Sequence, residues 1–185
     1  KYKKMKKNNE FDIISSSIDE ILKKKLPNYY GPWKIKKTPT GQSNPTYILR
    51  GKNKTLILRK KPVGKLLKSA HLIEREFRIL NHLSKTDLPV PKVYYLSENI
   101  KEIGSSYFIM DYLDGITFSD PSLPKQSKQQ RDKIYKSMNK GLSDLHSIIP
   151  KKIGLDNYGK TGNFFQRQLS RWSEQYEISK TSYIL

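Results

Sequence analysis

The sequence of 185 residues contains no cysteine, and it contains only three histidines. The absence of cysteine excludes disulfide bonds, thiolate zinc sites and cysteine nucleophiles, and it fits a reducing compartment such as the cytoplasm. No stretch approaches the roughly 20 consecutive apolar residues that a membrane-spanning helix needs. The basic start KYKKMKKNNE is not followed by the continuous apolar segment of a secretion signal. We therefore expect a cytoplasmic protein that has no membrane partner.

Acidic residues are also scarce: 17 Asp and Glu stand against 36 Lys and Arg, which gives a formal net charge of +19. A positive charge of this size is typical of nucleic-acid-binding proteins. However, only seven of the basic residues are arginine, and the lysines recur throughout the chain, as expected for a solvated surface. Four tyrosines that could stack on bases fall at strand-like positions, where core packing is the favoured role: Tyr94, Tyr95, Tyr107 and Tyr112. Nucleic-acid binding is therefore the weaker hypothesis, and steeply salt-dependent binding to DNA or RNA would revive it.

The spacing of apolar residues predicts a mixed α+β architecture. Five short runs of β-branched and aromatic residues predict strands, at residues 33–38, 45–50, 55–60, 92–97 and 106–113. Helical spacing marks four other segments, at residues 12–25, 70–83 and 127–147 and around Leu169 and Trp172. Ser69 precedes the second of these helices as a candidate N-cap, and Ser127 with Gln130 resembles a capping box at the start of the third.

Four features follow one another in the first 115 residues. The polar loop GQSNPTY precedes two strands, the second strand ends with Arg59, and the next helix offers Glu76. The last predicted strand, YFIMDYLDG, then runs into a turn. Protein kinases use this layout to hold a nucleotide: a strand cation reaches the phosphates, a helix glutamate orients the cation, and a linker backbone binds adenine. The combination is more specific than any one of its members.

Each feature also has an interpretation that involves no ligand. The loop lacks the spacing of a Walker A or G-x-G-x-x-G motif, and taken alone it fits an ordinary hairpin. Arg59 could be a surface charge at a strand end, with Lys60 on the opposite face because strand side chains alternate. Glu76 could be a solvated helix residue, although its position three residues after Ile73 places it, rather than Glu74, beside the apolar stripe. Residues 110–113 could be only the edge of a core strand.

Further stretches make the pattern more specific. They are LILRKKPVGKLL, SAHLIEREFRIL, PVPKV, IGSSYFIMDYLDG, DPSLP, DLHS, GLDNYGK and RQLSRWSEQY. Together with GQSNPTYIL they cover about residues 40–176, and they resemble the aminoglycoside phosphotransferase-like family, kinase-fold enzymes that include choline and homoserine kinases. The resemblance is greatest to the branch found beside or fused to acyl-CoA dehydrogenases. It implies a protein-kinase-like fold, with ATP and Mg²⁺ as cofactors.

The resemblance also implies roles for individual residues. Those that would contact the nucleotide are Gly41, Gln42, Ser43 and Asn44 in the phosphate loop, Arg59 as the strand cation, Glu76 as its helix partner, and Met110, Asp111, Tyr112 and Leu113 in the adenine linker. Arginine suits the strand position because a guanidinium group can pair in bidentate fashion with a carboxylate and with phosphate. The polar loop is thus expected to hold phosphate, provided that the strands form a kinase-like lobe.

One part of the family pattern is missing from these 185 residues. The family's catalytic motif resembles His-Gly-Asp with an Asn shortly after it, and a further Asp holds Mg²⁺, whereas Leu, Leu and Ser follow the three histidines here, His71, His82 and His146. His146 fits a structural role, and Asp144 beside it fits a surface residue. We therefore expect the catalytic residues and Mg²⁺ ligands beyond Leu185, so that this chain alone is inactive.

The implied organisation has three parts: a basic disordered lead at residues 1–10, a kinase-like N-terminal lobe at 11–115, and the beginning of a helical C-terminal lobe at 116–185. The chain starts at Lys1 and ends in apolar residues up to Leu185, which fits a fragment of a longer protein. Such a fragment should expose apolar surface that the rest of the protein would cover.

The predicted function is ATP-dependent transfer of the γ-phosphoryl group to a hydroxyl group of a small substrate. The relationship to the dehydrogenase branch favours a hydroxyacyl-CoA as acceptor over an aminoglycoside, and it suggests association or fusion with an acyl-CoA dehydrogenase. The alternative is a pseudokinase that binds nucleotide or a partner without turnover. A downstream His-Gly-Asp motif with a nearby Asn would favour the enzyme.

Overall fold

A computed structural model describes residues 10–39, 44–64, 71–160 and 162–180. The chain forms two compact units, Lys1–Ile148 and Ile149–Leu185. Three residues of the predicted phosphate loop (Gly41, Gln42 and Ser43), the predicted cap Ser69 and nearly all of the basic lead lie outside the described residues. The two units are considered separately below.

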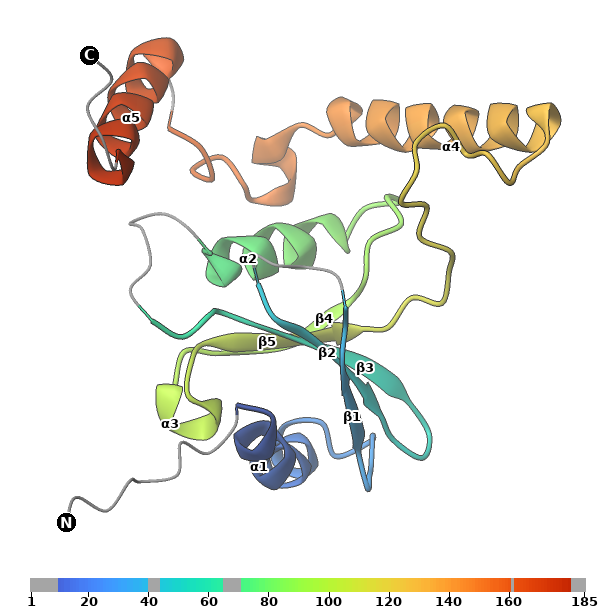
Figure 1. The fold of residues 1–185 in the computed structure, drawn as a ribbon, viewed down its shortest axis with the longest axis vertical. Helices are drawn as coiled ribbons and strands as arrows, with labels where there is room; N and C mark the ends of the chain where they lie inside the picture. The colour runs from blue at the N-terminus through green and yellow to red at the C-terminus, as the bar shows by residue number, and fades with distance from the viewer. Residues whose placement is uncertain (1–9, 40–43, 65–70, 161, 181–185) are drawn as a thin grey trace. The chain divides into compact units, whose positions relative to one another are not determined.

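The first unit is built on a five-stranded antiparallel sheet (Figure 1). Its strands are β1 (Lys34–Lys37), β2 (Thr46–Arg50), β3 (Thr55–Lys60), β4 (Val93–Ser97) and β5 (Tyr107–Asp111). Their order in the sheet is β1-β2-β3-β5-β4, and every neighbouring pair is antiparallel. The N–H of Gly51 donates to the carbonyl of Lys54 at 2.9 Å, which closes the turn between β2 and β3. The predicted α+β class and all five strands are confirmed.

Helix α1 (Glu10–Lys25) and the short helix α3 (Ile100–Ile103) cover one face of this sheet (Figure 1). Ile14, Ile18 and Leu22 recur every four residues along α1, so they lie on one side of the helix, and all three are fully buried. They pack with apolar side chains of β2, β3 and β5, including Leu49, Leu58, Tyr107 and Ile109. The sequence missed α3, because four residues are too few for a helical period to be recognised.

Helix α2 (Ile73–Leu83) covers the opposite face. Ile73 is fully buried beside Phe108, and the ring of Phe77 meets that of Phe108 edge to face with centroids 5.9 Å apart. The predicted start of this helix near residue 70 is wrong, because the N-cap is Leu72 and it makes no side-chain capping hydrogen bond. His71, just before it, has a left-handed backbone with φ of 58°, which a right-handed helix does not admit.

The remaining helices carry apolar side chains that face solvent. Helix α4 (Lys128–Ser147) starts with the predicted capping box of Ser127 and Gln130, and none of its side chains is fully buried. The second unit contains a 3₁₀ turn, η1 (Pro150–Ile153), and helix α5 (Phe164–Ser179). Four of the exposed apolar side chains are Met138 and Leu142 on α4 and Leu169 and Trp172 on α5. Within the described ranges, no helix is long and apolar enough to cross a bilayer.

Candidate functional site

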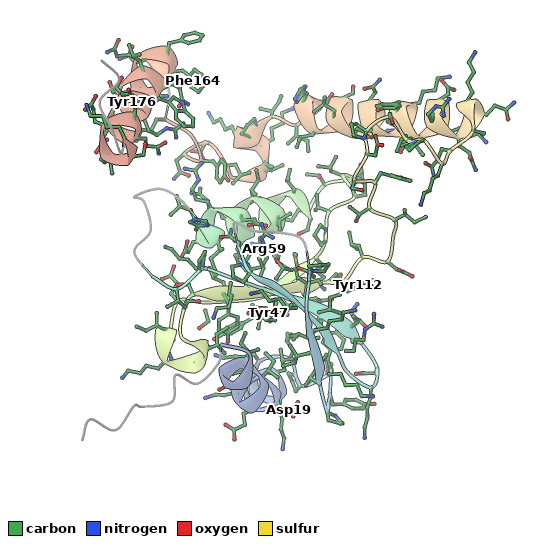
Figure 2. All side chains as sticks on the ribbon, viewed as in Figure 1. Asp19, Tyr47, Arg59, Tyr112, Phe164 and Tyr176 are labelled. Atoms are coloured by element: carbon green, nitrogen blue, oxygen red, sulfur yellow. The ribbon has the colours of Figure 1, made fainter. Side chains whose placement is uncertain are left out.

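Strand β3 presents two chemically different faces. Leu56, Leu58 and Lys60 point toward the core beneath α1, and Lys60 is fully buried there, with Nζ donating to the carbonyl of Ile103 at 3.1 Å. Arg59 points the other way, toward α2, as Figure 2 shows. The predicted opposite orientation of these neighbouring cations is confirmed. Of these two cations, only Arg59 therefore lies on the α2 side of the sheet.

Arg59 and Glu76 form an ion pair between β3 and α2. The guanidinium Nε lies 2.8 Å from Oε1 and 2.9 Å from Oε2 of the carboxylate. The two side chains are 26% and 33% exposed, so the pair is shielded on one side and open to a ligand on the other. Glu76 reaches Arg59 because it lies at the edge of the apolar stripe that begins at Ile73. The contact predicted from the sequence is confirmed.

A short polar chain extends from the guanidinium toward the predicted loop. Nη1 of Arg59 donates to Oγ1 of Thr46 at 3.1 Å, and this hydroxyl donates in turn to the backbone carbonyl of Asn44 at 3.1 Å. Asn44 is only 7% exposed, and its Oδ1 lies 3.0 Å from Nδ1 of His71. The structure thus brings Asn44 together with Arg59 and Glu76, all three of which the resemblance identifies as nucleotide-binding residues.

The sequence did not identify Thr46 or His71 as part of this cluster. Thr46 was recognisable in principle, because it stands directly opposite Arg59 in the β2–β3 hairpin and the register follows from the turn at Gly51 to Lys54. His71 carries no such signal. Its contact with Asn44 joins residues 27 positions apart, and local spacing does not encode such a contact.

The guanidinium of Arg59 can still donate a hydrogen bond to a ligand. Nε is engaged by Glu76 and Nη1 by Thr46, but no acceptor in the described part of the chain bonds to Nη2. A partly exposed guanidinium nitrogen of this kind is a suitable donor to an anionic oxygen such as that of a phosphate. The donor set therefore fits a nucleotide phosphate.

The four predicted linker residues occupy different environments. Met110 packs on the α2 side, next to the core of Ile73 and Phe108. Asp111 points to the other side, where its Oδ1 accepts from the Tyr94 hydroxyl and from Lys54 Nζ, each at 2.8 Å. Beyond the end of β5, Tyr112 is half-buried and Leu113 is exposed, and Figure 2 marks Tyr112 at this end of the sheet.

The contacts of Asp111 also shift the pKa values of two groups beside it. The hydrogen bond to Asp111 raises the pKa of the Lys54 ammonium group. Burial, together with hydrogen bonds to Tyr29 and Asp111, raises the pKa of the Tyr94 hydroxyl. The backbone N–H of Asp111 donates to the carbonyl of Lys92 at 2.9 Å. Both the side chain and the N–H of Asp111 are therefore occupied within the protein.

The described residues include no group of three or more histidine, cysteine or acidic side chains that could hold a metal ion. Asp144, which the sequence placed on the surface, pairs with Lys140 at 2.6 Å on α4, and His146 is exposed. The residues that the structure describes therefore do not form a complete Mg²⁺ site.

Comparison with known proteins identifies the family of this chain. Residues 34–183 match the model of the phosphotransferase enzyme family, APH. Acyl-CoA dehydrogenase family member 10 of Mus musculus is 42% identical over 173 residues, which cover 93% of this chain and 16% of that protein. Acyl-CoA dehydrogenase family member 11 of Rattus norvegicus is 37% identical over 92% of this chain and 22% of its own length. The chain thus spans less than a quarter of these relatives.

A solved structure agrees with the fold. A Ralstonia eutropha protein assigned as an aminoglycoside phosphotransferase superposes with a TM-score of 0.73 and 36% identity, over 92% of this chain and 49% of that one. The chain belongs to the phosphotransferase enzyme family and has its kinase-like aminoglycoside phosphotransferase fold.

Proposed function

We propose that this chain is the nucleotide-binding part of an ATP-dependent phosphotransferase that acts on a hydroxyl group of a small substrate. The observation that carries the proposal is the ion pair of Arg59 and Glu76, next to Thr46 and Asn44 on the α2 side of the sheet. Four polar residues converge there, from β2, β3, α2 and the segment just before β2. An arginine that served only as a surface charge would not need these polar partners.

In this proposal the protein prepares Arg59 to bind phosphate before the nucleotide arrives. Glu76 and Thr46 hold the guanidinium in one orientation, so little side-chain freedom remains to be lost on binding. Nη2 would donate to a phosphate oxygen of ATP, which supplies the phosphoryl group that is transferred. The predicted loop at Gly41, Gln42, Ser43 and Asn44 would cover the phosphates with backbone N–H groups.

Adenine would bind at the end of β5. Because the N–H of Asp111 is already bonded to Lys92, the backbone groups of Tyr112 and Leu113 would make the hydrogen bonds to the base. Met110 would contribute an apolar wall from the α2 side. Asp111 would then contribute indirectly, by fixing this end of the strand through Tyr94 and Lys54.

The remaining catalytic groups would come from outside this chain. No histidine in the sequence is followed by Gly-Asp, and the described residues form no metal-binding group. Transfer to a hydroxyl requires a base and Mg²⁺, so we propose that the 185 residues alone bind nucleotide weakly and do not turn over. The lobes would divide near residues 115 and 116, and the protein would act in the cytoplasm.

The acceptor is proposed by analogy. The relatives are named as acyl-CoA dehydrogenase family members, and this chain matches only 16% to 22% of those proteins. A hydroxyacyl-CoA acceptor, in a protein associated or fused with a dehydrogenase, is consistent with those names. The fold alone does not define a substrate.

Binding of a non-hydrolysable ATP analogue to a longer protein that contains this chain, measured by calorimetry, tests the nucleotide site. Arg59→Ala should weaken binding by about tenfold or more, since a charge-assisted contact is lost. Arg50→Ala is the matched control, because Arg50 is an exposed arginine on the neighbouring strand β2. Unchanged affinity in Arg59→Ala would remove Arg59 from the site, and no binding by the unaltered longer protein would remove the nucleotide site itself.

The second candidate is a pseudokinase that binds nucleotide without transferring phosphate. It is favoured by the same two observations, the missing His-Gly-Asp motif and the lack of a metal-binding group in the described ranges. Assay of phosphoryl transfer in a longer protein that contains this chain distinguishes the two. Nucleotide binding with no transfer to any hydroxylated acyl-CoA would favour the pseudokinase.

A further inference from the structure

The polar cluster around Arg59 closes on itself through His71. From Glu76 on α2 the contacts lead to Arg59, to the hydroxyl of Thr46, to Asn44, and from its Oδ1 to Nδ1 of His71, 3.0 Å away. The carbonyl of His71 then accepts from the N–H of Ile73, the first residue of α2, at 3.0 Å. The ring of contacts therefore starts and ends on the same helix.

We propose that His71 is a positioning residue for the nucleotide site, and that it acts by fixing Asn44. This inference rests on the proposed function. His71 ties the beginning of α2 to the residue at which the predicted phosphate loop joins β2, while Glu76 ties the first turns of the same helix to Arg59. The helix is thus attached to the phosphate-binding strands at two points instead of one.

The direction of the hydrogen bond defines what His71 does. Oδ1 of Asn44 is an amide oxygen and can only accept, so Nδ1 of His71 carries the proton. Both the neutral Nδ1–H tautomer and the imidazolium ion provide this donor, so the contact does not depend on the charge of the ring. With Oδ1 held, the buried side chain of Asn44 keeps one orientation, and the backbone carbonyl of Asn44 remains placed to accept from the Thr46 hydroxyl.

The backbone of His71 is consistent with a position maintained by its contacts. Its φ of 58° lies in the left-handed region, which costs a residue with a side chain free energy that glycine does not incur. Asparagine is the non-glycine residue that tolerates this region best, and its side-chain amide nitrogen follows Cγ as Nδ1 does in histidine. The position therefore allows the backbone strain and the side-chain donor to be varied separately.

Three variants at this position test the inference, with the affinity for a non-hydrolysable ATP analogue and the thermal unfolding midpoint measured for each. His71→Ala removes the donor and keeps the strained backbone, and it should weaken binding about fivefold, the size of one lost neutral hydrogen bond. His71→Asn restores a donor and should bind within about twofold of the unaltered chain. His71→Gly relieves the strain without restoring the donor, so it should unfold at a higher temperature than His71→Ala but bind no better.

The outcomes separate this inference from the proposed function. If the unaltered chain binds the analogue and His71→Ala binds equally well, the positioning role is wrong and the nucleotide site stands. If affinity follows the unfolding midpoint, so that His71→Gly regains binding, His71 is only structural and the inference is also wrong. If the longer protein that contains the unaltered chain does not bind the analogue, both the proposed function and the inference fail.

Discussion

Nε of Arg59 lies 2.8 Å from Oε1 of Glu76, although the two residues are 17 positions apart and belong to different elements. Two local patterns produce this contact. The alternation of β3 turns Arg59 away from the core that buries Lys60, and the helical period of α2 turns Glu76 toward the edge of the stripe that contains Ile73. Because each pattern is fixed by burial on its own element, the pair is formed without any ligand.

Removal of the Glu76 carboxylate should weaken the binding of phosphate by Arg59. Glu76→Ala frees the guanidinium from one orientation, so the affinity for an ATP analogue should fall about threefold to tenfold. The double variant Arg59→Ala with Glu76→Ala should bind no worse than Arg59→Ala alone, because Glu76 acts through Arg59. Glu74→Ala is the control, as it removes a carboxylate of the same helix turn that does not pair with Arg59. Additive losses in the double variant would contradict the positioning role of Glu76.

Replacement of Lys60 should affect stability and not binding. Lys60→Met retains the buried aliphatic volume but removes the Nζ donor, which leaves the carbonyl of Ile103 without that hydrogen bond. We expect the free energy of unfolding to fall by about 1–3 kcal/mol, measured by urea denaturation. Affinity for an ATP analogue should stay within about twofold, because Lys60 lies on the opposite face from Arg59. Lys52→Met, at an exposed turn position, provides the matched control.

The sequence predicted the parts of this fold whose causes are local. The burial of Ile14, Ile18 and Leu22 on α1 follows from their spacing, and the capping box of Ser127 and Gln130 follows from hydrogen bonds within four residues. All five strands were found because branched and aromatic runs are bounded by turn residues.

The errors lie where tertiary contacts decide the local structure. The start of α2 was placed too early, because the left-handed backbone of His71 accompanies a contact with Asn44 that no periodicity encodes. The predicted strand 106–113 was too long, because β5 ends at Asp111, where the side chain turns to Tyr94 and Lys54. In the candidate site, Arg59 and Glu76 were predictable from burial patterns, whereas His71 was not.

Glu102 should make stability depend on pH in the acid range. Burial alone would raise the pKa of this carboxyl group, but hydrogen bonds from Tyr107 and Ser97 favour the carboxylate, and the pKa is lowered below its usual 4.5. A group whose pKa is lower in the folded state stabilises the protein above its unfolded pKa, and this contribution is lost as the pH falls through the folded pKa.

The measurement is the free energy of unfolding in urea from about pH 6 down to about pH 3, a range that spans the titration of a carboxyl group. The unaltered protein should lose stability more steeply below about pH 4.5 than Glu102→Gln, because the amide does not titrate. Glu98→Gln, at an exposed position nearby, should lose stability below about pH 4.5 as steeply as the unaltered protein. Parallel curves for the unaltered protein and Glu102→Gln would contradict this assignment.

Gly51 is required by the close approach of the β2–β3 turn to the segment before β1. The N–H of Lys52 donates to the carbonyl of Tyr30 at 3.0 Å, and a Cβ on Gly51 would lie 2.8 Å from Cζ3 of Trp33 and 2.9 Å from the carbonyl oxygen of Tyr30. Trp33 is only 8% exposed, so it cannot move aside freely. Gly51→Ala should therefore lower the free energy of unfolding by about 1–3 kcal/mol, the usual cost of overpacking.

A second glycine provides a control of opposite sign. A Cβ on Gly141, within α4, would meet nothing within 4 Å. Gly141→Ala should therefore raise helix stability by about 0.5–1 kcal/mol, since alanine loses less backbone entropy in a helix. Circular dichroism followed through urea denaturation measures both variants on the same signal. If Gly51→Ala were as stable as the unaltered protein, the turn would have to shift away from Trp33. The β2–β3 hairpin, which carries Arg59, would then be held less firmly than the hydrogen bond between Lys52 and Tyr30 indicates.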